Sequence, residues 1–196
     1  DLADHPGVGL GVGGHLDRPD GPEAGPAADD ESVRYSIDLL TSFGFKVRKG
    51  EHLFDRDQYL AGKDRDRADD VNAMFADDGV DAIFTLRGGY GTQRILPFLD
   101  YDSVAANPKV LIGSSDITGL LIALFEKTGL VCFHGPAAGG NYSDYALSEF
   151  RKVLWKPASR TRIAAAPQFD NRPGRIDKHN RITRHAGGSA TGRLIG

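Results

Sequence analysis

The sequence contains little of what builds several common classes of protein. Its single cysteine, Cys132, excludes an internal disulfide framework and a metal site made of several cysteines. The formal net charge is only -3, which gives no electrostatic reason to expect nucleic acid or an anionic membrane as partner. No apolar stretch approaches the length that spans a bilayer. With 196 residues, 40% of them hydrophobic, the chain can form one α/β domain with a sizeable core and a short extension.

Short apolar or β-branched stretches alternate with helical patterns along most of the chain. Strands are expected near residues 7–14, 45–47, 80–86, 109–112 and 130–133, and helices near 29–43, 64–78, 93–96, 117–128 and 144–154. This alternation predicts a mostly parallel sheet with helices on both faces, an α/β fold of the Rossmann or flavodoxin kind. Cys132 lies in the apolar stretch 130–133 and is expected to be a buried small hydrophobe.

The composition changes near Lys156, where proline and arginine become frequent and apolar residues sparse. We therefore expect an α/β domain over residues 1–155 and a linker over residues 156–185. Residues 186–196 resemble the first strand of a further domain that then stops. This pattern predicts that the chain is a fragment of a longer protein or one product of a cleavage.

Residues 113–119, with the sequence GSSDITG, join a predicted strand directly to a predicted helix. Such a tight turn lifts a hydroxyl out of the sheet and places it at a helix N-terminus, where free amides favour negative charge. This is the geometry of a nucleophile elbow, although the sequence is not the usual G-x-S-x-G. Ser115 then offers the hydroxyl for acyl transfer, and the amide of Asp116 is a natural oxyanion donor. The alternative is that Ser114 or Ser115 simply caps the helix.

A second distinctive loop, residues 87–91 (RGGYG), follows the predicted strand 80–86. Open parallel sheets bind ligands beyond the carboxyl ends of their strands, so this loop and the serine turn are expected to share a site. The backbone of Gly88 and Gly89 is a candidate second oxyanion donor, and a phosphate cradle or a plain tight turn are the alternatives. His134 also follows a strand, and either lines the pocket or fixes the loop by hydrogen bonds.

Other motifs are given no functional role. Residues 9–14 match the dinucleotide pattern G-x-G-x-x-G, but the helix that the pattern requires does not follow. The acidic pairs at 69–70 and 77–78 are interpreted as solvated helix faces, and no metal site is predicted. The remaining histidines lie in polar or loop contexts without ligand spacing and are interpreted as surface residues: His5, His15, His52, His179 and His185.

Three stretches together resemble the LD-carboxypeptidase family of serine peptidases, which also includes the microcin C immunity peptidases. They are residues 81–91 with DAIF and RGGYG, residues 96–109 with LPFLDY and NPK, and residues 113–136 with GSSDIT and HGP. Their order and spacing match the family over roughly residues 30–155, and residues 192–196 resemble the start of its second domain. Ser114 stands where family members usually carry an aromatic residue, and the N-terminal strand matches poorly.

The resemblance implies that Ser115 is the nucleophile and that the backbone amides of Gly89 and Asp116 form the oxyanion hole. It implies removal of the terminal D-alanine from murein tetrapeptide, at an L,D bond, during recycling of cell-wall peptides in the cytoplasm. It implies no metal or organic cofactor, and a homodimer is expected because family members are often dimeric. The candidates for substrate binding are Arg87, Gly88, Tyr90, Ser114 and His134.

The family uses a Ser-Glu-His triad whose Glu and His lie in the second domain, beyond Gly196. A serine without a base is a poor nucleophile, so this polypeptide alone is expected to have little activity until a companion C-terminal part supplies both residues. The alternatives are a microcin-immunity-type peptidase that cleaves a peptidyl-nucleotide, a murein-peptide binding module without turnover, and a periplasmic sugar- or amino-acid-binding protein.

Overall fold

The computed structural model describes residues 7–13, 30–140 and 142–154. The chain divides into two compact units, Leu2–Asn141 and Tyr142–Ile195, and each is described by itself. In the second unit the described part is the helix α6 (Asp144–Leu154), where the sequence predicts one. The predicted linker at 156–185 and the predicted second-domain strand at 186–196 lie outside the described residues.

The first unit contains a sheet in which every strand pairing is parallel, as the alternation of strands and helices predicts. The strand order is β2-β1-β3-β4-β5. The strands are β1 (Gly7–Gly13), β2 (Lys46–Lys49), β3 (Ala82–Arg87), β4 (Val110–Gly113) and β5 (Phe133–His134). Because β3 and β4 are parallel neighbours, the loops that follow them leave the sheet at the same edge.

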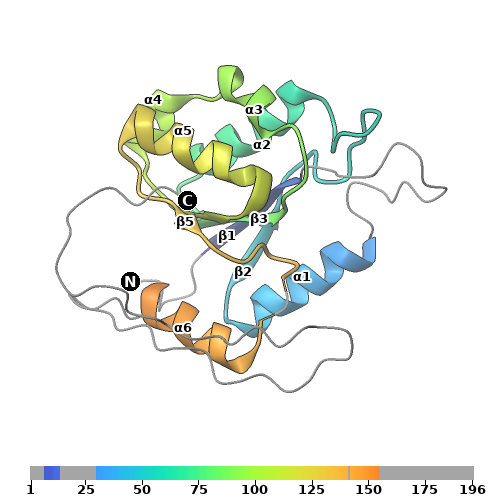
Figure 1. Ribbon diagram of the computed structural model, residues 1–196, viewed down its shortest axis with the longest axis vertical. Coiled ribbons are helices and arrows are strands. Elements are labelled where there is room, and N and C mark those ends of the chain that lie inside the picture. The colour runs from blue at the N-terminus through green and yellow to red at the C-terminus, as the bar shows by residue number, and fades with distance from the viewer. Residues whose placement is uncertain (1–6, 14–29, 141, 155–196) are drawn as a thin grey trace, which may run out of the picture. The chain divides into compact units, whose positions relative to one another are not determined.

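Helices cover both faces of this sheet, with α1 on one face and α2 to α5 on the other (Figure 1). The α/β fold with a parallel sheet is therefore confirmed. The helical elements of the first unit are α1 (Asp30–Ser42), α2 (Asp64–Ala76), α3 (Thr92–Ile95), η1 (Leu96–Phe98), α4 (Tyr101–Ala106), η2 (Ser115–Ile117) and α5 (Thr118–Thr128). None of the helices within the described ranges is long and apolar enough to cross a membrane.

Successive side chains of β3 serve the two faces of the sheet, since strand side chains alternate. Ile83 is fully buried in the main apolar cluster, which also contains residues of α2, α4 and α5. Phe84 is fully buried as well, but its ring packs against that of Phe45, with the ring centroids 5.8 Å apart. The sheet is thus buried on both sides at β3, the strand that leads into the glycine-rich loop.

Three local features differ from the sequence predictions. The last strand is only Phe133–His134, so Cys132 precedes it. The Cys132 side chain packs at the edge of the core, and burial raises the pKa of its thiol to about 12. Cys132 is partly rather than fully buried. The helix α4 was not expected, although Asp100 caps it by accepting a hydrogen bond from the amide of Ser103 at 2.9 Å. An aspartate in that position is an ordinary N-cap signal.

Replacing Phe84 by alanine tests the two-sided burial of β3. Removing a fully buried phenylalanine costs about 3 to 5 kcal/mol of unfolding free energy, through lost transfer energy and the cavity left behind. The matched control is Phe54→Ala, since Phe54 is 42% exposed and its loss should cost less than about 1 kcal/mol. Urea denaturation of both variants measures the difference, and equal losses would contradict the described core.

Candidate active site

Ser115 occupies a strained position immediately after the sheet. Strand β4 ends at Gly113, and the chain turns at once through Ser114 into the 3-10 turn η2 and then α5. The φ angle of Ser115 is +60°, in the left-handed region that side-chain-bearing residues rarely adopt. Strain of this kind is retained where the surrounding structure enforces it, commonly at functional sites. Ser115 is also exposed to solvent.

The tightness of this turn depends on the absence of a side chain at Gly113. A Cβ added there would lie 2.6 Å from Cγ2 of Ile117 and 2.6 Å from Oγ1 of Thr85. Both neighbours are fully buried and cannot easily move away. The turn therefore folds back closely over the end of β3, and this brings Ser115 toward the loop that follows β3.

The helix-cap interpretation of the two serines is not what the structure shows. Ser114 precedes η2 with extended backbone, and its side chain makes no capping hydrogen bond. Within the part of the chain that the structure describes, the Ser115 hydroxyl makes no hydrogen bond either. The Ser115 hydroxyl therefore stabilises no described part of the fold through a hydrogen bond.

The glycine-rich loop meets the serine turn, as the positions of the two loops at neighbouring strand ends predict. A Cβ added to Gly88 would lie 2.8 Å from Cβ of Ser115 and 3.3 Å from its Oγ. Gly89 follows with a φ angle of +139°, which favours glycine. The loop backbone can approach the serine this closely only without a side chain at Gly88.

Asp116 joins the same two loops through its side chain. One carboxylate oxygen, Oδ2, accepts a hydrogen bond from the amide of Thr92 at 2.8 Å. Thr92 is the first residue of α3 and directly follows the glycine-rich loop. The sequence pointed only to the backbone amide of Asp116, because nothing in the spacing shows which distant amide its carboxylate reaches. The oxyanion roles of the Gly89 and Asp116 amides stay predictions.

Comparison with known proteins shows the family to which the chain belongs. The profile of the LD-carboxypeptidase N-terminal domain matches residues 22–135, which include both loops. The chain belongs to the LD-carboxypeptidase family. It is 32% identical over 178 residues to the microcin C7 self-immunity protein MccF of Escherichia coli, covering 82% of this chain and 52% of that protein. It is 43% identical over 102 residues to the murein tetrapeptide carboxypeptidase of Pseudomonas aeruginosa, covering 52% of this chain and 33% of that protein.

A solved structure of MccF, an inactive mutant in the apo state, aligns with a TM-score of 0.67 at 31% sequence identity. The alignment covers 78% of this chain and 45% of the MccF chain. The present chain spans about half or less of the length of the curated relatives it matches. The resemblance seen in the sequence is therefore confirmed for the N-terminal domain of the LD-carboxypeptidase family.

The other predicted site residues of this LD-carboxypeptidase domain lie at the same strand ends with fewer contacts. Arg87 ends β3 and is exposed, and Tyr90 is 54% exposed, with its ring centroid 6.0 Å from that of Tyr59. His134 is exposed and pairs in register with Gly113. Its ring makes no hydrogen bond to any residue that the structure describes, so the structure gives no support to a loop-fixing role.

A buried arginine holds the far end of the glycine-rich loop. Arg67 of α2 is 2% exposed, and its Nη2 donates to Oδ1 of Asp64 at 2.6 Å and to the carbonyl of Gly91 at 3.3 Å. Arg94 also bonds Asp64, and this hydrogen bond is the main reason that the pKa of Asp64 is lowered. Arg67 was not among the predicted site residues, although it stands one helical turn before the core residue Val71 on the same face.

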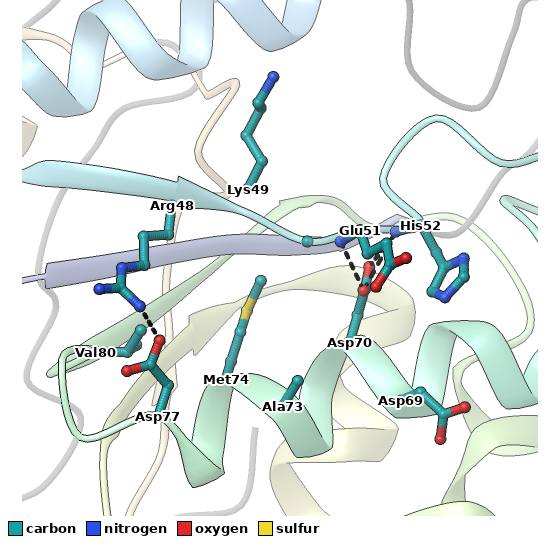
Figure 2. Close-up of a pocket in the computed structure, with 11 residues that line it drawn as sticks. Arg48, Lys49, Glu51, His52, Asp69, Asp70, Ala73, Met74, Asp77 and Val80 are labelled. Atoms are coloured by element: carbon teal, nitrogen blue, oxygen red, sulfur yellow. Dashed lines mark hydrogen bonds and ion pairs between the residues drawn. The ribbon is translucent and has the colours of Figure 1, made fainter.

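A pocket of about 290 Å³ lies elsewhere, between the end of β2 and α2 (Figure 2). It contains none of the predicted site residues. It is lined by Arg48, Lys49, Gly50, Glu51, His52, Asp69, Asp70, Ala73, Met74, Asp77 and Val80. Its most buried polar group, the carboxylate of Asp70, accepts hydrogen bonds from two backbone amides and so has a structural role. We therefore place the candidate active site at Ser115 instead.

Asp70 holds the chain as it leaves β2. Its carboxylate accepts hydrogen bonds from the amides of Glu51 at 2.9 Å and His52 at 3.2 Å, as Figure 2 shows. A Cβ at Gly50 would lie only 2.3 Å from Oδ2 of Asp70. Burial raises the pKa of Asp70 despite these hydrogen bonds. The interpretation of Asp70 as part of a solvated helix face is therefore wrong, because the carboxylate points inward to satisfy two amides.

His52 also forms a side-chain interaction that its interpretation as a surface histidine did not include. Its Nδ1 lies 2.8 Å from Oδ2 of Asp55, and this hydrogen bond is the main cause of its raised pKa. Ligand atoms of His52, Asp55 and Asp66 lie within 4.8 Å of one another. Sequence spacing did not reveal this cluster, because Asp66 comes from a different element, α2.

Replacing Gly113 by alanine tests the tight turn. The added Cβ must displace Ile117 or Thr85, and overpacking of this kind costs about 1 to 3 kcal/mol. Gly119→Ala is the matched control. Gly119 lies in α5, and a Cβ added there would be 3.4 Å from Cγ of Gln93, an ordinary contact distance. Alanine there should leave stability unchanged or raise it by up to about 1 kcal/mol. Chemical denaturation compares the two, and a neutral Gly113→Ala would refute the described packing.

The His52–Asp55 pair predicts a pH-dependent contribution to stability. Because the folded pKa of His52 is raised above its ordinary 6.5, the stabilisation is present below that value and disappears as pH rises through the folded pKa. The difference in unfolding free energy between wild type and His52→Gln should therefore be larger near pH 5 than near pH 9. Denaturation at a series of pH values measures it. A difference that grows with pH would show that the pair does not favour the charged imidazole.

Proposed function

We propose that this chain is the nucleophile-bearing part of a serine LD-carboxypeptidase that removes the terminal D-alanine from murein tetrapeptide. The observation that carries the proposal is the exposed Ser115, held at a φ angle of +60° against the glycine-rich loop. A strained serine at a strand-to-helix turn is the arrangement that presents a nucleophile in α/β hydrolases. Membership of the LD-carboxypeptidase family supports the reaction class.

The proposed reaction is acyl transfer in two steps. The Oγ of Ser115 attacks the carbonyl carbon of the L,D peptide bond, and the amides of Gly89 and Asp116 stabilise the oxyanion that forms. The carbon–nitrogen bond then breaks, D-alanine leaves with a proton on its amine, and the peptide remains as an ester on Ser115. Water hydrolyses this ester and restores the serine hydroxyl.

The base that takes the proton from Ser115 is proposed to come from the second domain of the family, together with the acid that orients it. Among the described residues no imidazole or carboxylate forms a hydrogen bond with the Ser115 hydroxyl. His134 lies on β5 beside Gly113, and its exposed ring is proposed to face the substrate. Catalysis then requires the family's Glu and His in addition to residues 1–196.

The likeness to MccF supports a second candidate. MccF is a microcin C7 self-immunity protein, and the alignment with it covers 82% of this chain. An immunity-type peptidase would cleave a peptidyl-nucleotide with the same serine chemistry, so the two candidates share Ser115 and differ in the substrate. A murein-peptide binding module is the non-enzymatic candidate, and it would not need a strained serine.

Ser115→Ala tests the nucleophile in the complete protein, by which we mean this chain joined to a second domain of the family. Release of D-alanine from murein tetrapeptide should fall by about 10⁴- to 10⁶-fold, because a side chain without a hydroxyl cannot form the ester. Ser42→Ala is the control, since Ser42 is exposed and its hydroxyl only bonds the carbonyl of Leu39. This variant should keep wild-type turnover.

The same assay distinguishes the candidates. Turnover of a peptidyl-adenylate but not of the tetrapeptide would favour the immunity-type peptidase. A complete protein that binds the tetrapeptide, turns over neither substrate and does not react with a fluorophosphonate would favour the binding module. Full tetrapeptide turnover by Ser115→Ala would exclude Ser115 as the nucleophile.

A further inference from the structure

We propose that Asp116 is a positioning residue, whose carboxylate holds the glycine-rich loop, residues 87–91, in place beside Ser115. This inference rests on the proposed function of Ser115. It starts from the 2.8 Å hydrogen bond in which the amide of Thr92 donates to Oδ2 of Asp116. The carboxylate belongs to the residue directly after the nucleophile, and the amide directly follows the loop, so one bond ties the two together.

The amide of Thr92 needs an acceptor from another part of the chain. Thr92 begins α3, and the first amides of a helix have no partner within the helix. The residue before it is Gly91, which has no side chain to cap the helix. Thr92 is also fully buried, so water does not readily replace a lost acceptor. Without the Asp116 carboxylate, the loop must shift to satisfy this amide.

The glycine-rich loop is held at two points that enclose Gly89. On one side Gly88 packs against Ser115, at a distance that excludes any side chain. On the other side Thr92 is bonded to Asp116. Gly89 and Tyr90 lie between these two points, and Gly89 has a φ angle of +139°. The direction of the Gly89 amide, the proposed oxyanion donor, is therefore set by the Asp116 bond.

Arg67 supports the same segment from the core side. Its Nη2 donates to the carbonyl of Gly91, while Asp116 accepts from the next amide along the chain. The peptide group between Gly91 and Thr92 is thus bonded at both its oxygen and its nitrogen. A loop fixed in this way needs no rearrangement when charge develops on the substrate, which is the condition for an effective oxyanion hole.

The experiment compares three variants of the complete protein on murein tetrapeptide. Asp116→Ala removes the acceptor, and kcat should fall by about 10²- to 10³-fold, the usual effect of losing one oxyanion donor. KM should stay within about 3-fold, because ground-state contacts are untouched. Asp116→Asn keeps an acceptor oxygen and should return kcat to within about 10-fold of wild type. Asp69→Ala removes an exposed carboxylate of α2 and should change neither constant.

Thermal unfolding shows whether each variant is folded. A folded Asp116→Ala protein with wild-type kcat would overturn the inference, as would a folded Asp116→Asn protein that loses as much kcat as Asp116→Ala. Should Asp116→Ala fail to fold, Asp116→Asn decides alone: near-native kcat supports the inference, and a 100-fold loss with unchanged KM overturns it. Full turnover by Ser115→Ala would overturn the proposed function and the inference with it, whereas the Asp116 outcomes overturn the inference alone.

Discussion

Backbone packing around Ser115 leaves no room for a side chain at Gly113 or at Gly88, and the site depends on this constraint. At Gly113 an added Cβ would meet Ile117 and Thr85 at 2.6 Å, and at Gly88 it would meet Ser115 at 2.8 Å. The first glycine lets the chain turn sharply after β4, and the second lets the neighbouring loop reach the serine. Because β3 and β4 are adjacent parallel strands, both turns occur at one edge of the sheet. The strained φ angle of Ser115 follows from this geometry.

The free-energy cost of the strained backbone at Ser115 is small compared with the free energy gained by burying the side chains that follow it. A non-glycine residue in a rare backbone region costs of order 1 to 3 kcal/mol. Ile117 lies two residues later and is fully buried, and α5 then buries Leu120 and Leu124 completely. Each such side chain contributes about 1.5 to 3 kcal/mol when it leaves water. The helix therefore holds the turn closed, so the serine keeps its strained conformation without a hydrogen bond to its hydroxyl from any described residue.

Local patterns in the sequence were enough to predict most of the elements and the edge of the sheet where the two loops meet. The helical patterns near residues 64–78 and 117–128 predicted α2 (Asp64–Ala76) and α5 (Thr118–Thr128) to within two residues of their ends. The contacts that fix the site were not predictable in this way. The bond from Thr92 to Asp116 joins residues of different elements, as does the bond from Arg67 to Gly91. Charge on a helix does not show which carbonyl or amide it will reach.

Two charged residues of α2, Asp70 and Arg67, stabilise two different loops of this domain. Asp70 sits under the exit of β2 and satisfies the amides of Glu51 and His52, so it fixes a loop that carries none of the predicted site residues. Arg67, one helical turn away on α2, bonds the carbonyl of Gly91 and so acts on the loop beside Ser115. The same helix thus anchors both loops through inward-pointing charged groups. Burying a charged group costs free energy unless it is hydrogen-bonded, so the position of α2 is tied to the shape of the loop beside Ser115.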